Sequence, residues 1–317
     1  MDQNAGHKML RYILSRLLIL IIIIYSLISS LTGCTSGKVT SDKTESRKID
    51  SLIKVQKLDD KGILVTFGYD AISAINTKKG IVIIDAGIST GLTARYKKII
   101  QEEFKRDDFI YVINTHGHND HCRGNSVFMN SSVAGHVNCL QEMSGQFSDP
   151  EKAIRNLSRI AEDYEQQLLG IDPATREWEE LFTQKIRYRY ACNDLKNKVP
   201  VKQPDITFTD SMRLDFGDIT LEMIYFGKCH SNSDILVHVP QIKTVFTGDL
   251  FSEYGRPGIS DTLMTDKEKW ERAVIWTEKR MNNIEHVIEG HGRILSVSDL
   301  KQFNSNILRR CTGEYKN

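Results

Sequence analysis

Four potential metal ligands stand within six residues of one another at the end of an apolar run. The run 109–114 has the composition of a strand, and it continues into Thr115-His116-Gly117-His118-Asn119-Asp120-His121. Imidazole and carboxylate groups are the usual protein ligands of zinc and similar ions, and three or more can enclose a metal where the backbone curls. The sequence therefore predicts a metal site at the end of a rigid strand.

Three later residues are candidates to complete this site. His230 lies in Gly227-Lys228-Cys229-His230-Ser231, Asp249 in Thr247-Gly248-Asp249-Leu250, and His291 in Glu289-Gly290-His291-Gly292, each after an apolar, strand-like run. Taken singly, each is as typical of a turn as of a site, but together with the first cluster they form a ligand set. A catalytic metal keeps an open position for water, so we expect ligands from several strand ends.

The hydrophobic pattern predicts a mixed α+β fold. Strands are expected over 63–67, 71–76, 81–85 and 109–114, and again over 206–208, 212–216, 219–225, 235–239 and 243–247. Helices are expected over 93–104 and 266–281. Several of these strands are almost entirely apolar, which is typical of a sheet covered by another sheet or by helices.

Residues 139–200 interrupt this pattern and predict an inserted helical hairpin. Ser148-Asp149-Pro150-Glu151 has the form of a helix start, and apolar residues recur at helical spacing as far as Gly170. A second helix is expected to begin at Asp172-Pro173, with Trp178 and Phe182 on its apolar stripe. The hairpin either packs on the core or caps the active site, and the two roles are compatible.

The first 52 residues have the layout of an export signal followed by a tether. Basic residues precede an apolar run over 17–31, and Leu31-Thr32-Gly33-Cys34 resembles a bacterial lipoprotein signal. We expect a signal peptide over 1–33, lipidation of Cys34, a flexible tether over 34–52 and a domain over 53–317. The protein would then be anchored by its lipid to a membrane of the bacterial cell envelope, facing outside the cytoplasm. A plain signal peptide or a retained anchor is the alternative.

The charge balance argues against a nucleic-acid partner. Lysine and arginine total 42, and aspartate and glutamate total 41, so no basic field would attract a phosphate backbone. Apart from Cys34, five cysteines are scattered without the dense spacing of a disulfide scaffold. We expect a small-molecule substrate, and the cysteine pattern alone does not predict a particular disulfide.

At these motifs the chain resembles the metallo-β-lactamase-like hydrolase superfamily. The leading motif, histidine-x-histidine-x-aspartate-histidine, is intact in residues 116–121, and the three later ligands follow in order. The resemblance runs from about Ile53 to the C-terminus and implies a four-layer αββα sandwich with the metal site at one edge.

The resemblance also implies a role for each residue. A first ion would be held by His116, His118 and His230, and a second by Asp120, His121 and His291, with Asp249 bridging the two. Asp120 would also orient the attacking hydroxide or relay a proton, and Asp85 would support the ligands from behind. Two zinc ions are expected, with iron or manganese as alternatives.

The expected activity is hydrolysis of a small ester, thioester, lactone or amide by a metal-bridging hydroxide. Asp249 favours this interpretation, because a cysteine-containing zinc β-lactamase would present sulfur at that position. An envelope β-lactamase remains one alternative, and a mononuclear iron persulfide dioxygenase is another. A third alternative is a non-catalytic binding module, for which degenerate ligands would be expected.

Overall fold

The computed structural model describes residues 36–146, 148–251 and 267–312. The chain divides into two units, residues 1–51 and residues 52–317. The signal segment 1–33 and the predicted lipidation site Cys34 lie outside the described residues. Among the described helices, none is both long and apolar enough to cross a bilayer.

The segment predicted as a flexible tether is helical instead. Helix α2 spans Ser36–Leu52, so the prediction was wrong for these residues. The segment lacks proline and has one glycine near its start, and its three lysines, Glu45 and Arg47 favour helices. Its polar composition, taken as a sign of flexibility, is equally that of a solvated helix.

The second unit contains two β-sheets. Along the first sheet, the strands up to β4 run antiparallel and those from β4 to β7 run parallel. In spatial order, its strands are β1 (Lys54–Lys57), β2 (Gly62–Phe67), β3 (Asp70–Thr77), β4 (Gly80–Ile84), β5 (Phe109–Ile113), β6 (Ser132–His136) and β7 (Ile206–Phe208). Strand β4 is buried at every position, because both of its faces are covered.

The second sheet has six strands, and only its β11–β12 pair is parallel. In spatial order, they are β13 (Ile294–Leu295), β12 (His286–Glu289), β11 (Thr244–Gly248), β10 (Ile235–Val239), β9 (Thr220–Tyr225) and β8 (Ser211–Asp215). Strands β1, β6 and β13 were not predicted from the sequence, and β12 was predicted only as a strand-like run before His291. Strand β1 is exposed along its whole length and carries no alternation, and β13 has only two residues.

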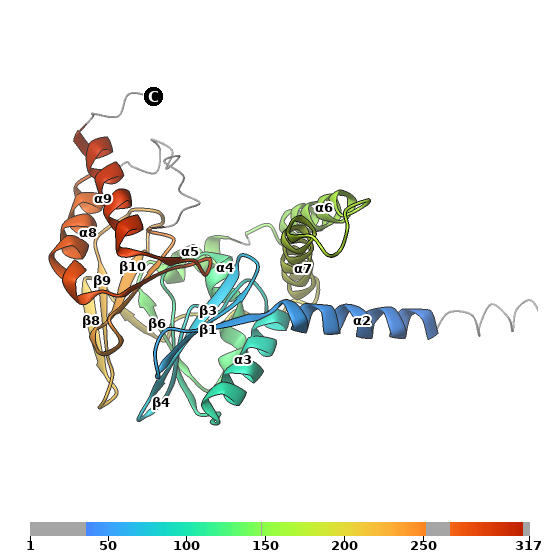
Figure 1. Ribbon diagram of the computed structural model, residues 1–317, viewed down its shortest axis with the longest axis horizontal. Coiled ribbons are helices and arrows are strands. Elements are labelled where there is room, and N and C mark those ends of the chain that lie inside the picture. The colour runs from blue at the N-terminus through green and yellow to red at the C-terminus, as the bar shows by residue number, and fades with distance from the viewer. Residues whose placement is uncertain (1–35, 147, 252–266, 313–317) are drawn as a thin grey trace, which may run out of the picture. The chain divides into compact units, whose positions relative to one another are not determined.

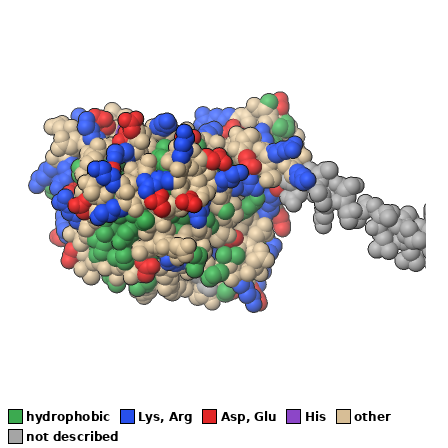
Figure 2. Space-filling view, turned by 90° about the horizontal axis from the view of Figure 1, so that it is seen from below, with side chains coloured by type: hydrophobic (Ala, Val, Ile, Leu, Met, Phe, Trp, Pro, Cys, Tyr) green, Lys and Arg blue, Asp and Glu red, His purple; other side chains and the backbone are tan. Residues whose placement is uncertain are grey.

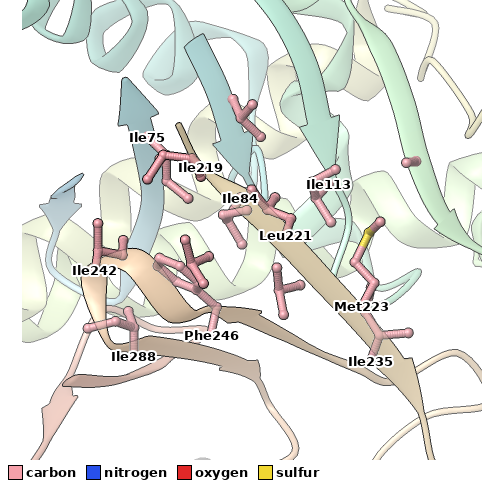
Figure 3. Packing of buried hydrophobic residues seen from close by; sticks show 14 of the residues in the cluster. Ile75, Ile84, Ile113, Ile219, Leu221, Met223, Ile235, Ile242, Phe246 and Ile288 are labelled. Atoms are coloured by element: carbon pink, nitrogen blue, oxygen red, sulfur yellow. The ribbon is translucent and has the colours of Figure 1, made fainter. Parts of the chain in front are cut away.

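The two sheets pack face to face through one apolar cluster. Figure 3 shows side chains of the first sheet, such as Ile75 and Ile113, meeting Leu221, Met223 and Phe246 of the second. All five are almost completely buried. Because this contact holds the sheets rigidly together, loops at the same edge of both sheets face one another.

Helices cover the outer faces of both sheets (Figure 1). Helix α3 (Thr90–Phe104) lies against the first sheet, and the Ser89 side chain caps it by accepting a hydrogen bond from the Leu92 amide. Helices α8 (Lys267–Arg280) and α9 (Val297–Thr312) cover the second sheet through Trp270 and Leu300. The predicted four-layer αββα sandwich is confirmed. Short helices complete it: α4 (Asn119–Cys122), η1 (Arg123–Phe128), α5 (Cys139–Gly145), η2 (Pro240–Ile242) and η3 (Met281–Asn283).

The predicted helical hairpin is present between β6 and β7. Helix α6 (Pro150–Gln167) starts at Asp149, whose side chain accepts a hydrogen bond from the Lys152 amide. Helix α7 (Arg176–Lys196) begins four residues later than expected and is capped by Thr175. Asp172 accepts a hydrogen bond from the Ala174 amide, so the Asp-Pro pair forms the preceding turn. The two helices pack against each other, and α7 also contacts α3.

Charged side chains of both signs are interspersed over the face drawn in Figure 2, with hydrophobic side chains grouped between them. This mixture agrees with the near balance of basic and acidic residues in the sequence. Since neither sign of charge dominates this face, we expect the function to depend on a local arrangement of residues.

Replacing Leu221 by alanine tests the contact between the sheets. Leu221 is fully buried, so Leu221→Ala should lower the free energy of unfolding by about 2–5 kcal/mol. Ile275→Ala on α8, where the side chain is 40% exposed, should change it by less than about 1 kcal/mol. Urea unfolding of metal-stripped protein measures both, and equal losses would contradict the assignment of the core.

Candidate metal centre

The candidate site lies where strand ends of both sheets meet. Asp85 follows β4, and the loop with the clustered histidines follows β5. Asp249 follows β11, and His291 stands two residues beyond β12. These are two pairs of parallel strands, and their carboxyl ends point to the same edge of the sandwich. His230 lies in the loop that connects β9 to β10.

The structure brings all seven predicted ligands together. Their nitrogen and oxygen atoms form three overlapping groups within which every pair lies within 4.8 Å. The groups are His116, His118 and His230; His116, His121 and Asp249; and Asp120, His121 and His291. The first and third match the two ligand sets that the resemblance implied.

Asp249 lies between these two groups. Its Oδ1 is 3.5 Å from His121 Nε2, and its Oδ2 is 3.3 Å from His291 Nε2 and 3.6 Å from His230 Nε2. One carboxylate therefore contacts histidines of both groups.

The donor spacing fits metal ions. Two ligands about 2.0 Å from one tetrahedral zinc lie about 3.3 Å apart. His118 Nδ1 and His230 Nε2 are 3.3 Å apart. His116 Nε2, His121 Nε2 and Asp249 Oδ1 are buried without a hydrogen-bond partner among the described residues. Such groups are costly in a protein interior unless a cation or a donor satisfies them, so the residues fit a metal.

Asp85 supports the centre from behind. Its Oδ2 lies 3.0 Å from His121 Nδ1 and also accepts a hydrogen bond from the Thr115 hydroxyl, while its Oδ1 accepts one from the Thr115 amide. Contact with Asp85 orients the ring so that His121 Nε2 faces the centre. Asp85 has a φ of 57°, a strained left-handed conformation for a residue other than glycine.

Two further contacts orient ligand rings. The Nδ1 of His291 is 2.9 Å from the backbone oxygen of Tyr69, in the β2–β3 turn, and can donate to it. The Nδ1 of His116 lies 3.2 Å from the Thr115 hydroxyl. In both rings Nε2 is left to face the cluster, which is the usual arrangement around a metal.

Burial and charge prepare these groups for a cation. Burial lowers the pKa of His116 well below its usual range, and it also lowers the pKa of His118 and His230, so these imidazoles are neutral. Burial alone would lower the pKa of His121 too, but neighbouring carboxylates, Asp249 foremost, raise it well above the usual range. This excess of negative charge around one imidazole favours a bound cation.

Glycines allow the close approach of these loops. A Cβ on Gly290 would overlap Asp249 Oδ1 and His121 Cε1. Gly248, directly before Asp249, has a φ of 50°, and a Cβ there would overlap the Thr115 side chain. Side chains at these two positions would push the ligands apart.

A cavity of about 650 Å³ opens beside the second ligand group. Asp120 and His291 border it on one side, and the α6–α7 hairpin supplies much of the rest. The cavity is also lined by residues whose place in the site was not predicted from the sequence: Tyr69, Arg123, Tyr164, Gln184, Arg187 and Tyr188. The spacing of the last three predicts that they share one face of α7, but it does not predict which part of the protein that face contacts.

The remaining histidines and cysteines of interest lie outside the ligand cluster. His136 stacks on Tyr225, and its Nε2 is 2.9 Å from the Thr209 oxygen. His238 contacts Glu222. Cys122 and Cys229 are buried thiols, and burial raises the pKa of Cys122 well above its usual range. These contacts are structural in character.

Gly290→Ala should damage the metal centre, because its methyl group would displace Asp249 and His121. We expect metal affinity to fall at least about 10-fold. Gly145→Ala is the matched control, since a Cβ there meets nothing within 4 Å. Metal content after dialysis against graded chelator measures the effect. Equal metal retention by both variants would contradict the predicted close contact.

Comparison with known proteins agrees with this fold. The family model for the metallo-beta-lactamase superfamily matches residues 65–275, more than half of the chain. The metallo-beta-lactamase type 2 of Bacillus cereus is 22% identical over 220 residues, covering 69% of this chain and 66% of that protein. The match thus spans just under two thirds of that relative's length.

Solved structures share the fold at low sequence identity. A metallo-beta-lactamase from Pontibacter korlensis superposes with a TM-score of 0.52 and 18% identity, covering 81% of this chain and 99% of that one. The sec-alkylsulfatase Pisa1 from Pseudomonas sp. gives a TM-score of 0.57 and 14% identity, over 82% of this chain and 42% of that one. The family supports metal-dependent hydrolysis as the class of reaction. With the family model covering most of the sandwich, the chain belongs to the metallo-beta-lactamase superfamily.

Proposed function

We propose that this protein is a dinuclear zinc-dependent hydrolase acting on a small ester, thioester, lactone or amide. The observation that carries the proposal is the position of Asp249, whose two oxygens contact histidines of both ligand groups. A carboxylate in that position can hold two cations close together and offset part of their mutual repulsion.

In this proposal each ligand group holds one ion. His116, His118 and His230 would hold the first, Asp120, His121 and His291 would hold the second, and Asp249 would be shared. When bound, two zinc ions would act as Lewis acids and lower the pKa of bound water toward neutrality. Iron or manganese can use the same mixed nitrogen and oxygen donors, so metal identity is part of the test.

Asp120 is the proposed catalytic residue. Its carboxylate borders the cavity and is 32% exposed, far more than the 10% of Asp249. From this position it can accept a hydrogen bond from the attacking water, orient it and take up its proton. The cavity volume of about 650 Å³ suits a small molecule.

β-Lactam hydrolysis is the second candidate, because the Bacillus cereus relative bears that name. Asp249 speaks against a cysteine-containing centre, since it places oxygen where that class has sulfur. A chromogenic cephalosporin therefore belongs among the substrates tested.

The decisive experiment joins metal analysis to a substrate panel. Purified protein should contain two zinc ions per chain and hydrolyse at least one thioester, lactone, ester or simple amide from a panel that also includes β-lactams. Asp249→Asn should retain less than one ion per chain and lose at least about 100-fold in kcat/KM. Asp60→Asn, at an exposed carboxylate remote in sequence from the ligands, should change neither.

Three outcomes would overturn the proposal. One iron per chain with oxygen uptake would instead support a persulfide dioxygenase. Full metal occupancy without turnover of any substrate would support a binding module. Hydrolysis restricted to the cephalosporin would support a β-lactamase.

We also propose that Cys34 carries a lipid that anchors the protein to the cell envelope, facing outside the cytoplasm. The support is the apolar run and the Leu31-Thr32-Gly33-Cys34 segment. Several acyl chains together give stable anchoring, because each buried methylene contributes about 0.8 kcal/mol.

Cys34→Ser should block lipidation and leave the leader uncleaved. Mass spectrometry of the N-terminal peptide should show a diacylated Cys34 in the wild type and none in the variant. Ser36→Ala is the control and should behave as wild type. An unmodified Cys34 in wild-type protein from membranes would contradict the proposal.

A further inference from the structure

The cavity beside the second ligand group contains a buried arginine that the proposed chemistry does not use. Arg187, on α7, lines the cavity with its side chain only 5% exposed. It comes from the inserted hairpin and lies beyond the sandwich strands that carry the ligands. The hairpin therefore places a fixed positive charge in the proposed substrate site.

Most of the hydrogen-bonding capacity of Arg187 is not used by the described residues. A guanidinium has five N–H donors. Its Nη1 donates to Gln184 Oε1 at 2.8 Å, while its Nε is buried without a hydrogen-bond partner among those residues. Its Nη2 is 3.9 Å from Asp120 Oδ2, which is too long for a hydrogen bond. A buried cation with unused donors is costly unless an anion satisfies it.

The nearby carboxylates do not supply that anion. Asp120 is a proposed metal ligand, and two divalent cations outweigh the charges of Asp120 and Asp249. Burial raises the pKa of Asp70 and the nearby charge of Arg187 lowers it. Both Asp70 oxygens are already engaged, however, since one accepts a hydrogen bond from the Ile88 amide and the other accepts one from the Tyr96 hydroxyl. No ion pair joins Asp70 to Arg187 in the part of the chain that the structure describes. Arg187 therefore adds positive charge to a site that would already be positive with both metal ions bound.

The surroundings of Arg187 suit a small organic anion. Tyr188 lies beside the guanidinium, whose carbon is 5.9 Å from the ring centroid, and stacks on Tyr164. Ile88 and Leu157 add apolar surface to the wall, and Asn156 adds an amide. A guanidinium with a planar fork matches a carboxylate in geometry.

We propose that Arg187 and Gln184 form a carboxylate-binding subsite, so that the substrates of this enzyme are small hydrolysable molecules carrying a carboxylate. Gln184 holds the guanidinium, and Arg187 binds the substrate anion. Asp120 Oδ2 lies 3.9 Å from both Arg187 Nη2 and His291 Nε2. The bound carboxylate and the scissile bond are therefore only a few bonds apart. This inference rests on the proposed function for its substrates, although the subsite itself belongs to the hairpin.

Binding of a simple carboxylate tests the subsite without any turnover. Calorimetry on the full chain with benzoate should show binding to the metal-loaded protein and weaker binding after metal removal, because the charges of Asp120 and Asp249 are then no longer offset. Arg187→Met should weaken it roughly 10–100-fold. Arg159→Met, at an exposed arginine of α6, is the matched control and should bind as wild type. Benzoate that binds only to metal-loaded protein, and equally to the Arg187 variant, would overturn the proposal.

A pair of substrates tests the consequence for catalysis. For two aryl esters that differ only in a carboxylate on the acyl group, Arg187→Met should lower kcat/KM roughly 10–100-fold for the charged ester and change it little for the neutral one. Arg187→Lys should fall between, because it retains the charge but loses the fork. Metal content and the thermal unfolding midpoint should match the wild type, and Arg187→Lys serves if the methionine variant does not fold.

The outcomes separate this inference from the proposed function. Equal losses for both esters, with metal lost as well, would mean that Arg187 only positions Asp120, and would overturn the subsite. Anion binding that depends on Arg187, in a protein that hydrolyses nothing, would sustain the subsite and refute the hydrolase.

Discussion

Seven imidazole and carboxylate groups converge at one edge of the sandwich, and their mutual accommodation is the constraint on which the site depends. Three of their polar atoms are buried without a hydrogen-bond partner among the described residues. Such an arrangement is costly on its own and becomes favourable around cations. Two local backbone features help to bring these groups together. Asp85 has a left-handed φ, and Gly290 leaves room where a methyl group would overlap Asp249.

The sandwich makes this convergence possible. The apolar contact between the sheets holds β4 and β5 of one sheet against β11 and β12 of the other, so that their carboxyl ends open at one edge. Ligands carried on the ends of packed strands keep their positions better than ligands on free loops, because the strands have little freedom to move. The rigid core therefore supplies the precision that metal coordination requires.

The hairpin contributes a different kind of residue. The strand ends supply ligands, whereas α6 and α7 supply a cavity wall with aromatic rings, amides and a buried arginine. The predicted hairpin was confirmed, and both expected roles are present, because α7 packs against α3 and both helices line the cavity beside the ligands. Under the proposed function, the strand ends would carry the metal chemistry and the hairpin would select the substrate.

The sequence by itself determined the order of most elements, the sandwich fold and the residues that converge. Strands β2 to β5 and β7 to β11 lie within one or two residues of their predicted bounds, because alternating and continuous apolar runs reflect burial on one or both faces. Prediction failed where that signal is weak, as in exposed β1, two-residue β13 and polar helix α2. The family resemblance already implied that Asp249 lies between the two histidine groups, but only the tertiary structure decided that Arg187 enters the cavity. That placement depends on how helices and sheets pack across long sequence separations, which no local pattern encodes.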